Sequence, residues 1–410
     1  MKRKVLTLVS LVCFTLAVNA QKSITIEVTN PTNDVRKDQP VVIGLTPGND
    51  IQSAMVVVDG REIPSQLDDL NRDGIYDELC FLADLGKKQT REYTVCFYKN
   101  GEPHIYPFRV TAEMLLRNPK VKEKNKHDFF ITEISAPKEL KDPYHLLHHH
   151  GVAFESELIA VRIYFDKRQT LDLYGKKKPR LELAETQFYT TAEQKQEGYG
   201  DDVLWVGNTF GLGAMRGWNG SQPTLVENVS YRTQRIVSYG PLRTIVEVED
   251  RGWKADPRIA RINMTVRYTL YAGHRDIDVD VFFNRDLKGI NFSTGLINVK
   301  GSKEFTDNKG LRGCWGSDFP SGANDSISHP RETVGLGIYI PDQYRVSEEP
   351  ANKDNYAFVV SPPKDRLSYK LAYTSANETF GYKSEKEWFK FLKEWRESIE
   401  NPIIVKRHDE

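Results

Sequence analysis

Residues 259–271 read Ile-Ala-Arg-Ile-Asn-Met-Thr-Val-Arg-Tyr-Thr-Leu-Tyr, and apolar and polar side chains alternate along most of this stretch. Successive side chains of an extended chain point to opposite faces, so the apolar ones from Ile262 to Leu270 would share one face. Residues 241–249, 274–284 and 334–340 are further strand-like runs. Gly, Asn, Asp and Pro separate such runs, as is typical of antiparallel strands joined by turns. The sequence therefore predicts a mainly β protein.

Strand-like runs near the start of the chain are shorter than the later ones. The early runs predict an N-terminal antiparallel β-sandwich over residues 21–112, with strands at 23–29, 54–58, 78–84 and 91–98. Residues 113–128, rich in Lys and Asn, are interpreted as a linker. A larger layered β domain is predicted over residues 129–383. Within it, residues 154–166 are apolar on both faces, as expected of one long strand covered on both sides.

The end of the chain carries a helix signal. Ser384 and Glu387 have the spacing of a capping box, in which each side chain bonds a backbone N–H of the first turn. Trp388, Leu392 and Trp395 then recur at helical spacing. Residues 384–410 are predicted to form a C-terminal amphipathic helix and tail.

The start of the chain has the pattern of a secretory signal. Residues 2–4 are basic, residues 5–18 are almost entirely apolar, and the small Ala20 precedes Gln21. This pattern predicts a signal peptide cleaved after Ala20 and a periplasmic or secreted protein. No later apolar stretch is long enough to cross a bilayer, so no transmembrane segment is expected.

Composition excludes several classes of partner. The chain has 57 Lys and Arg residues against 57 Asp and Glu residues, whereas nucleic-acid binding calls for a basic excess. It has no Gly-rich turn of the nucleotide-binding type, so no nucleotide or redox cofactor is expected. The odd number and wide spacing of Cys80, Cys96 and Cys314 do not suit a disulfide framework. Cys80 and Cys96 are predicted to be buried free thiols, and a disulfide between them across a hairpin is the alternative.

Residues 69–78 read Asp-Leu-Asn-Arg-Asp-Gly-Ile-Tyr-Asp-Glu, which resembles the start of a calcium-binding loop. Oxygen-bearing side chains stand at alternate positions, and glycine is sixth. The candidate ligands of a structural Ca²⁺ are Asp69, Asn71, Asp73, the carbonyl of Ile75, and Asp77. The twelfth position is Cys80 where a calcium loop has glutamate, so a metal-free turn rich in Asp, Asn and Gly is the alternative.

Three consecutive histidines end at His150, and Arg162 and Tyr164 follow. Neighbouring side chains of an extended chain diverge, so the histidines are not expected to share one metal ion. We interpret this segment as a lyase site: His150 is the general base, Tyr164 the proton shuttle, and Arg162 the clamp for the carboxylate of an acidic sugar. His149 is a candidate substrate-binding residue. The alternative for Arg162 and Tyr164 is a polar pair on the face of a sheet.

Glu155 and Glu157 offer a second kind of chemistry. In one strand they would share a face about 6.6 Å apart, from the strand rise per residue. That separation is close to the spacing of the two carboxylates of an inverting glycosidase. The alternative is a solvated strand end with two exposed glutamates.

Tryptophans in loops rich in Gly, Asn and Asp are candidate sugar-binding residues: Trp205, Trp218 and Trp315. The CH face of a sugar ring stacks on an aromatic ring, while short polar side chains bind its hydroxyls. The alternative is a tryptophan folded back onto a sheet edge.

One family resemblance is visible at residues 149–166, with Tyr174-Gly175 after them, at Asp73–Leu79 and at Asp202–Trp205. Over most of its length the chain resembles secreted Bacteroidetes-type proteins grouped as domain of unknown function 4861. The resemblance implies a role in polysaccharide utilisation and a galactose-mutarotase-like β-supersandwich for the larger domain. It implies no catalytic residues, and fold alone does not determine function.

Two hypotheses follow from these features. The leading one is an enzyme that acts on acidic oligosaccharides as a lyase or a hydrolase. The alternative is a glycan-binding protein of the cell envelope without catalytic activity. A shared pocket for the tryptophans, His150 and Arg162 would favour the enzyme, and a separate aromatic strip would favour the binding protein.

Overall fold

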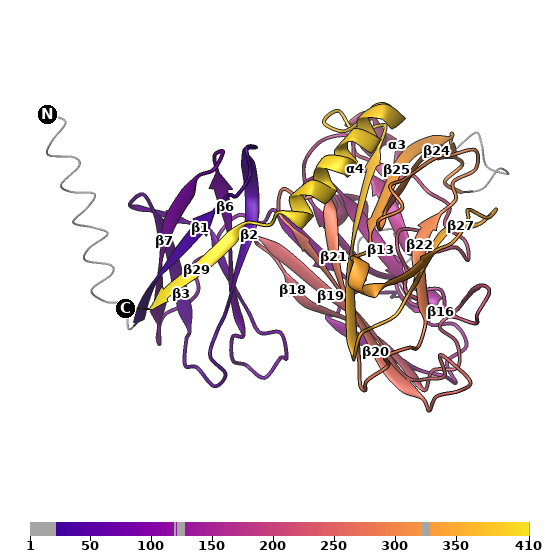
Figure 1. Ribbon diagram of the computed structural model, residues 1–410, viewed down its shortest axis with the longest axis horizontal. Helices are drawn as coiled ribbons and strands as arrows, with labels where there is room; N and C mark the ends of the chain where they lie inside the picture. The colour runs from indigo at the N-terminus through magenta and orange to yellow at the C-terminus, as the bar shows by residue number, and fades with distance from the viewer. Residues whose placement is uncertain (1–21, 119, 121–127, 322–328, 410) are drawn as a thin grey trace, which may run out of the picture. The chain divides into compact units, whose positions relative to one another are not determined.

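The computed structural model describes residues 22–118, 120, 128–321 and 329–409 (Figure 1). The predicted signal peptide and half of the predicted linker lie outside the described residues. The chain forms two compact units. The first comprises the chain up to Arg109, Gly240–Arg243 and Glu397 onward, and the second comprises Val110–Tyr239 and Thr244–Arg396. Both are built mainly from antiparallel strands, which confirms the predicted fold class.

The first unit is a sandwich of two sheets. Its larger sheet has the order β29 (Ile404–Asp409), β1 (Lys22–Thr29), β7 (Thr90–Tyr98), β3 (Ser53–Val58), β4 (Arg61–Ile63). The smaller has the order β2 (Arg36–Gly44), β6 (Glu78–Leu85), β5 (Ser65–Asp68). Alternate residues of β1, such as Ile24 and Ile26, are buried in one core with residues of both sheets, as the period of two predicted.

Strand β29 was not expected, because its residues were assigned to a tail. It pairs antiparallel with β1, from Thr29 opposite Ile404 to Ile24 opposite Asp409. Ile404 and Val405 are partly exposed. An apolar run this short, followed by charged residues, carries too little alternation to predict a strand.

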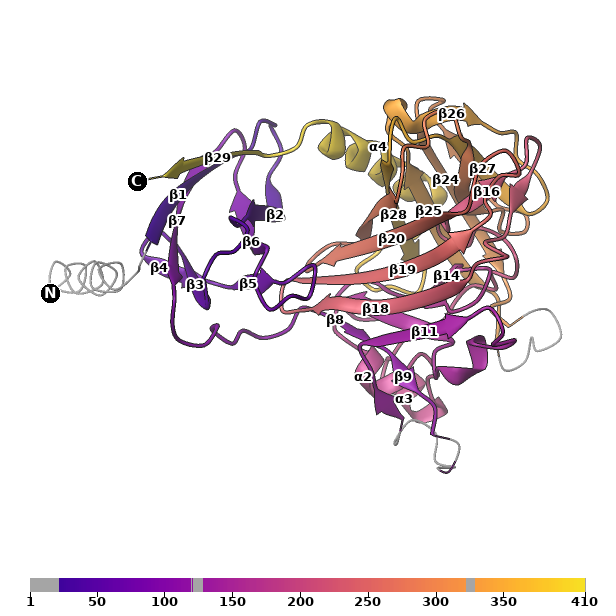
Figure 2. The ribbon, with the colours of Figure 1, turned by 90° about the horizontal axis from the view of Figure 1, so that it is seen from below.

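The second unit is layered. A nine-stranded sheet has the order β11 (Glu133–Pro137), β18 (Tyr231–Tyr239), β19 (Arg243–Trp253), β20 (Ile262–Tyr271), β21 (Asp276–Phe283), β28 (Arg366–Ser375), β25 (Glu332–Tyr339), β24 (Leu311–Asp318), β23 (Lys303–Thr306). Figure 2 shows β11, β18, β19 and β20 running side by side. In β20, every apolar residue from Ile262 to Leu270 is buried, as predicted.

Two five-stranded sheets form the other layer. One has the order β15 (Asp201–Asp202), β14 (Leu171–Gly175), β13 (Ala160–Tyr164), β12 (Gly151–Ser156), β8 (Val110–Glu113). The other has the order β17 (Pro223–Thr224), β16 (Arg216–Trp218), β22 (Phe292–Ile297), β27 (Asn355–Val360), β26 (Arg345–Glu348). Val161 of β13, Phe292 of β22 and Val266 of β20 belong to one continuous core, so both sheets pack on the nine-stranded sheet.

The prediction of one strand over residues 154–166 was wrong. The segment is a hairpin of β12 and β13, with Phe154 opposite Val161. The hydroxyl of Ser156 accepts hydrogen bonds from the backbone N–H of Leu158 at 3.1 Å and of Ile159 at 3.3 Å, which closes the turn. A local side-chain bond of this kind ends a strand without a glycine or proline to mark the place.

Helix α4 (Glu385–Glu400) begins as predicted, with the Ser384 hydroxyl accepting from the backbone N–H of Glu387 at 3.3 Å. Its buried face packs on glycines of neighbouring strands of the nine-stranded sheet. A Cβ added at Gly335 would lie 2.8 Å from the rings of Trp388 and Trp315, and one added at Gly337 would lie 2.4 Å from Leu392. The indole N–H of Trp388 donates to the carbonyl of Leu336 at 3.1 Å. The helix therefore needs the glycines for its close approach.

Cys80 and Cys96 are buried and free, as predicted, and so is Cys314. Burial raises the pKa of the Cys80 and Cys314 thiols to about 12, so both stay protonated at neutral pH. Among the described residues, no helix is long and apolar enough to span a membrane.

The packing of α4 generates a first prediction. Replacing Gly335 by alanine forces a Cβ against two rigid indole rings, which is expected to lower the free energy of unfolding of the second unit by about 1–3 kcal/mol. Urea titrations followed by tryptophan fluorescence measure this effect. The control is Gly44→Ala, where no atom lies within 4 Å of the added Cβ. Equal stability of Gly335→Ala and the parent protein would contradict the packing described here.

Candidate functional site

The outer face of β13 carries the richest cluster of polar side chains identified from sequence. Val161 and Ile163 point into the core, so Arg162 and Tyr164 point to the opposite face. Leu183 of α2 (Leu183–Thr186) and Phe188 pack on the same sheet with Ala153, Ala160 and Tyr174, and cover part of this face.

His150 joins this cluster through Tyr144. The two rings are stacked with centroids 3.8 Å apart, and the centroids of His150 and Tyr164 are 6.5 Å apart. The guanidinium of Arg162 lies 5.3 Å from the centre of the Tyr164 ring. The structure thus brings together His150, Arg162 and Tyr164, which the sequence proposed as one site.

Arg162 is already paired with two carboxylates. Its Nη2 lies 2.6 Å from Oδ2 of Asp172 and 3.0 Å from Oδ2 of Asp202, and its Nη1 donates to the Tyr189 hydroxyl at 3.1 Å. Both acidic partners would have to be displaced before this guanidinium clamped the carboxylate of a substrate. The position therefore favours a role in orienting Asp172 and Asp202 over the role predicted for Arg162.

Asp202 is a residue of this cluster that the sequence analysis did not assign to a site. Burial and the nearby Asp172 carboxylate raise its pKa well above the usual range, although Arg162 opposes the shift. Its side chain is 23% exposed, whereas that of Asp172 is 1% exposed. A partly exposed carboxyl group with a raised pKa has the properties of a general acid. In the sequence, the two adjacent acidic residues Asp201 and Asp202 shortly before Trp205 could have indicated a candidate site.

The groups proposed as base and proton shuttle are poorly suited to those roles. Burial and the charge of Arg162 lower the pKa of His150 to about 3, so its imidazole stays neutral and is a very weak base. Burial and Asp172 raise the pKa of Tyr164 well above its usual range. Its hydroxyl donates to Oδ2 of Asp172 at 2.6 Å. This geometry gives no support to proton abstraction by His150 and Tyr164.

Glu155 and Glu157 do not form a pair on one strand, because the hairpin turn separates them. Glu155 is buried and lies 2.5 Å from the Lys176 ammonium. It also accepts from the backbone N–H of Glu182 at 2.9 Å and of Leu183 at 2.8 Å, at the start of α2. Glu157 accepts from the backbone N–H of Gly273 at 2.8 Å. Glu155 therefore anchors the covering segment, which is not the hydrolytic role proposed from sequence.

His149 is fully buried and lies 2.7 Å from the Glu113 carboxylate. The next histidine back, His148, lies 2.6 Å from the Asp128 carboxylate. In this arrangement His149 has no surface for a substrate, so its location gives the predicted binding role no support.

The three tryptophans lie on different elements. Trp205 is 59% exposed, in the loop that follows β15, three residues after Asp202. Trp218 ends β16 in another sheet. Trp315 lies in β24, where its ring and that of Trp388 both border Gly335. Trp205 is thus close in the chain to the Arg162 cluster, while Trp218 and Trp315 belong to separate surroundings.

A cavity of about 860 Å³ lies beside this cluster in the second unit. Tyr144 and Asp166 line it, together with residues 136–143 and 226–230. Arg168 pairs with Asp166 and lies 4.8 Å from the Tyr144 ring centre and 4.7 Å from that of Tyr164. Tyr144 therefore connects the cavity with His150. The volume is within the range of small-molecule binding sites.

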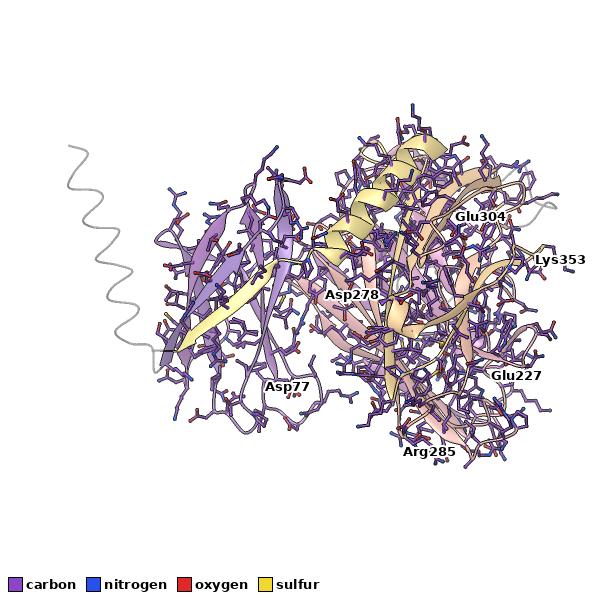
Figure 3. All side chains as sticks on the ribbon, in the orientation of Figure 1. Asp77, Glu227, Asp278, Arg285, Glu304 and Lys353 are labelled. Carbon is purple, nitrogen blue, oxygen red and sulfur yellow. The ribbon has the colours of Figure 1, made fainter. Side chains whose placement is uncertain are left out.

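The predicted calcium loop lies between β5 and β6 of the first unit (Figure 3, where Asp77 is labelled). Its carboxylates accept backbone hydrogen bonds: Asp69 from Gly74 at 2.8 Å, Asp77 from Leu70 at 2.7 Å and Asp73 from Ile75 at 2.9 Å. Gly74 has φ +88°, which favours glycine. Among the described residues, no group of three or more His, Cys, Asp or Glu is placed to hold a metal. Calcium binding here stays a prediction.

Comparison with known proteins places this layered β chain in a family. Residues 28–405 match the family described as Domain of unknown function (DUF4861), so the chain belongs to that family. No curated protein matches it.

Some solved structures match the chain at low sequence identity. An alpha-mannosidase from Enterococcus faecalis V583 is 9% identical with a TM-score of 0.49, and the match covers 97% of this chain and 48% of the mannosidase. The chain thus spans about half the length of that protein. A TPR-domain containing protein from Parabacteroides distasonis ATCC 8503 is 10% identical with a TM-score of 0.31, over 67% of this chain and 57% of the other.

The raised pKa of Asp202 generates a prediction about pH. Below about pH 3.9, the usual pKa of aspartate, this group is protonated in both the folded and the unfolded protein. Above that pH the unfolded chain loses the proton while the folded protein keeps it, so Asp202 costs stability as pH rises toward its folded pKa. The stability of Asp202→Asn relative to the parent should therefore increase from pH 4 to pH 8, as measured by urea unfolding. The control is Asp201→Asn, which replaces the neighbouring partner of Lys195. If the difference in unfolding free energy between Asp202→Asn and the parent does not change with pH, the raised pKa of Asp202 is contradicted.

The calcium prediction has its own test. Calcium at about 100 times its dissociation constant should stabilise the first unit by about 2.7 kcal/mol relative to protein in a chelator. The double variant Asp69→Asn, Asp73→Asn should lose that difference. Magnesium at the same concentration is the control cation. Melting curves that are identical with calcium and with chelator would leave the loop as a metal-free turn.

Proposed function

We propose that this protein is a glycoside hydrolase and that Asp202 is its proton donor. The observation that carries the proposal is that Asp172 and Asp202 both lie within 3.0 Å of one nitrogen of Arg162, with Asp202 the more exposed. Two carboxylates around one guanidinium repel each other, and this repulsion and burial favour the protonated form of Asp202.

The chemistry assigned to Asp202 is proton transfer to the oxygen of a departing sugar. As the bond between the anomeric carbon and that oxygen breaks, the carboxyl proton passes to the oxygen. The carboxylate that remains is stabilised by Arg162, 3.0 Å away. Water then adds its oxygen to the anomeric carbon, and one proton of that water restores Asp202. The role of Arg162 is to position Asp172 and Asp202, and the nearby Asp172 carboxylate, together with burial, holds the pKa of Asp202 high.

Support for a carbohydrate substrate comes from Trp205. Its exposed indole stands three residues from Asp202, where the CH face of a sugar ring could stack on it. The cavity beside Tyr144 offers space for further sugar units. The lysine and arginine side chains that line this cavity are accompanied by acidic residues, among them Asp142, Asp166 and Glu227. The lining of the cavity therefore does not favour an acidic substrate.

The proposal predicts the behaviour of Asp202→Asn. Loss of general acid catalysis should lower turnover of unactivated oligosaccharides by about 10²–10⁴-fold, while the variant remains folded. Release of reducing ends from a panel of neutral and acidic oligosaccharides identifies a substrate and measures the effect. A dinitrophenyl glycoside of the same sugar needs no protonation of its leaving group, so Asp202→Asn should retain most of the parent rate on it.

The control variant is Asp201→Asn, which should retain activity on both substrates. Equal losses on both substrates in Asp202→Asn would assign Asp202 a structural role. Unchanged activity would overturn the proposal.

The second candidate is a glycan-binding protein without turnover, and the exposure of Trp205 is the observation that favours it. In that case no oligosaccharide yields reducing ends, a glycan of the panel changes tryptophan fluorescence, and Trp205→Ala abolishes that change. Binding would then be the same in Asp202→Asn as in the parent.

A further inference from the structure

His150 has no role in the proposed hydrolysis, although the structure holds its ring in one orientation. The ring stacks on that of Tyr144, with the two planes 3° apart. Its Nδ1 lies 3.2 Å from the backbone carbonyl oxygen of Tyr144. A carbonyl oxygen accepts hydrogen bonds and donates none, so Nδ1 carries the proton of the neutral ring and Nε2 carries the lone pair. The histidine therefore presents a hydrogen-bond acceptor at Nε2.

The backbone of His150 is also held in place. Its N–H donates to the carbonyl of Leu147 at 3.1 Å, and its carbonyl accepts from the N–H of Phe165 at 2.7 Å. Its φ is +61°, in the left-handed region that residues other than glycine seldom adopt. Strained backbone of this kind is concentrated at ligand sites and active sites. The turn that leads into β12 thus sets where Nε2 lies.

The Nε2 atom is open to a ligand. His150 is half-buried, whereas the two histidines before it, His148 and His149, are buried. Within the described residues, the hydrogen bond of the His150 side chain is the one made by Nδ1, and Nε2 is not among the buried polar atoms that lack a partner. Nε2 therefore meets solvent, and a ligand can take the place of water there.

His150 is linked to Asp202 through two other side chains. The ring centres of His150 and Tyr189 are 6.5 Å apart, and the Tyr189 hydroxyl accepts from Nη1 of Arg162 at 3.1 Å. Nη2 of Arg162 lies 3.0 Å from Oδ2 of Asp202. The acceptor on His150 and the carboxyl group assigned to proton donation thus belong to one cluster around Arg162.

The lone pair on Nε2 restricts what this atom binds. A sugar hydroxyl donates a hydrogen bond to a lone pair, whereas a carboxylate oxygen has no proton to donate. The titratable and charged groups near the ring are Arg117, Tyr144, His145, Arg162, Tyr164 and Tyr189. Burial and the charge of Arg162 lower the pKa of His150 to about 3, so near neutral pH the ring gains no second proton with which to bind an anion. The ring therefore favours a hydroxyl group.

We propose that His150 selects the substrate of Asp202, with Nε2 accepting a hydrogen bond from one hydroxyl group of a neutral sugar unit. This role deepens the proposed function, on which it rests. A site that binds a substrate hydroxyl in this way rejects the analogue that lacks it, because the acceptor is then left without its donor.

The first measurement is nitrogen NMR of the full chain, labelled at histidine, from pH 5 to pH 8. His150 should carry its proton on Nδ1 throughout this range. Titration with the methyl glycosides of glucose, galactose and mannose should shift the Nε2 signal for at least one of them and leave the Nδ1 signal in place. A proton on Nε2, or an Nε2 signal that none of these glycosides moves, would overturn the role of His150.

Two substitutions separate the acceptor from the fold. His150→Asn keeps an N–H for the Tyr144 carbonyl and tolerates a positive φ, but it has no atom at the position of Nε2. His150→Gln places a carbonyl oxygen near that position. The glycoside that shifts Nε2 should bind about tenfold more weakly to His150→Asn, and His150→Gln should recover part of the loss. The analogue without the recognised hydroxyl should bind the parent and His150→Asn equally weakly. Equal affinity of the glycoside for the parent and for a folded His150→Asn would contradict the assignment.

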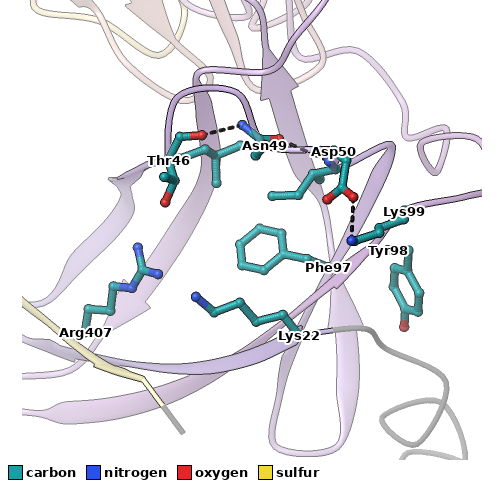
Figure 4. A pocket seen from close by; sticks show the side chains of 10 residues that line it. Lys22, Thr46, Asn49, Asp50, Phe97, Tyr98, Lys99 and Arg407 are labelled. Carbon is teal, nitrogen blue, oxygen red and sulfur yellow. Dashed lines mark hydrogen bonds and ion pairs between the residues drawn. The ribbon is translucent and has the colours of Figure 1, made fainter.

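Controls come from the first unit. It has a cavity of about 300 Å³, where the Lys99 ammonium lies 2.5 Å from Asp50 (Figure 4). Lys99→Met alters that cavity, and His104→Asn makes the matched change at a histidine paired with Glu62. Both variants should bind the glycoside as the parent does. Affinity lost in Lys99→Met and kept in His150→Asn would place the binding in the first unit.

Failure of this role and failure of the hydrolase are distinguishable, because the NMR titration needs no turnover. Release of reducing ends with an unmoved Nε2 signal would overturn the role of His150 alone. A shifted Nε2 signal without turnover of any oligosaccharide would overturn the hydrolase alone.

Discussion

The arrangement of the second unit's outer face depends on the guanidinium of Arg162. It is buried on a strand whose other side faces the core, so its charge has to be matched where it lies. The Asp172 carboxylate of β14 matches it at 2.6 Å, Asp202 of β15 lies 3.0 Å from it, and Phe188 covers it at 4.2 Å. One side chain thereby holds the edge of a sheet, the segment that covers it and the exposed carboxyl group that we assign to catalysis.

That constraint also explains why the polar cluster differs from an ordinary surface network. Surface ion pairs contribute little to stability and leave pKa values near normal. Here burial removes the water that would otherwise stabilise each charge, so the groups divide into those that stay charged and those that stay neutral. Arg162 has its pKa raised, whereas His150 stays neutral and Tyr164 stays protonated. The same burial that makes His150 unsuitable as a base makes Asp202 suitable as an acid.

The sequence predicted what depends on local periodicity. Most strands of both units, the helix at Trp388–Trp395 and the common face of Arg162 and Tyr164 follow from alternation or helical spacing. What it could not predict depends on contacts between distant residues. The turn at Ser156 rests on one hydroxyl, and Glu155 is buried because Lys176 and the start of α2 meet it. Asp202 has a raised pKa because it is buried and because β14 brings Asp172 beside it. No pattern within a short window contains that information.

The pairing of β29 with β1 has a consequence for the order of synthesis. Residues 22–29 leave the ribosome early, yet their outer partner, residues 404–409, is among the last parts of the chain described here to be made. Domains at the start of a chain usually fold as soon as they emerge. In this protein one edge of β1 stays unpaired until residues 404–409 have been synthesised. The unit whose strands begin the described chain therefore completes its larger sheet only after the second unit has been synthesised. Until then, that open edge is available to chaperones and to unwanted partners.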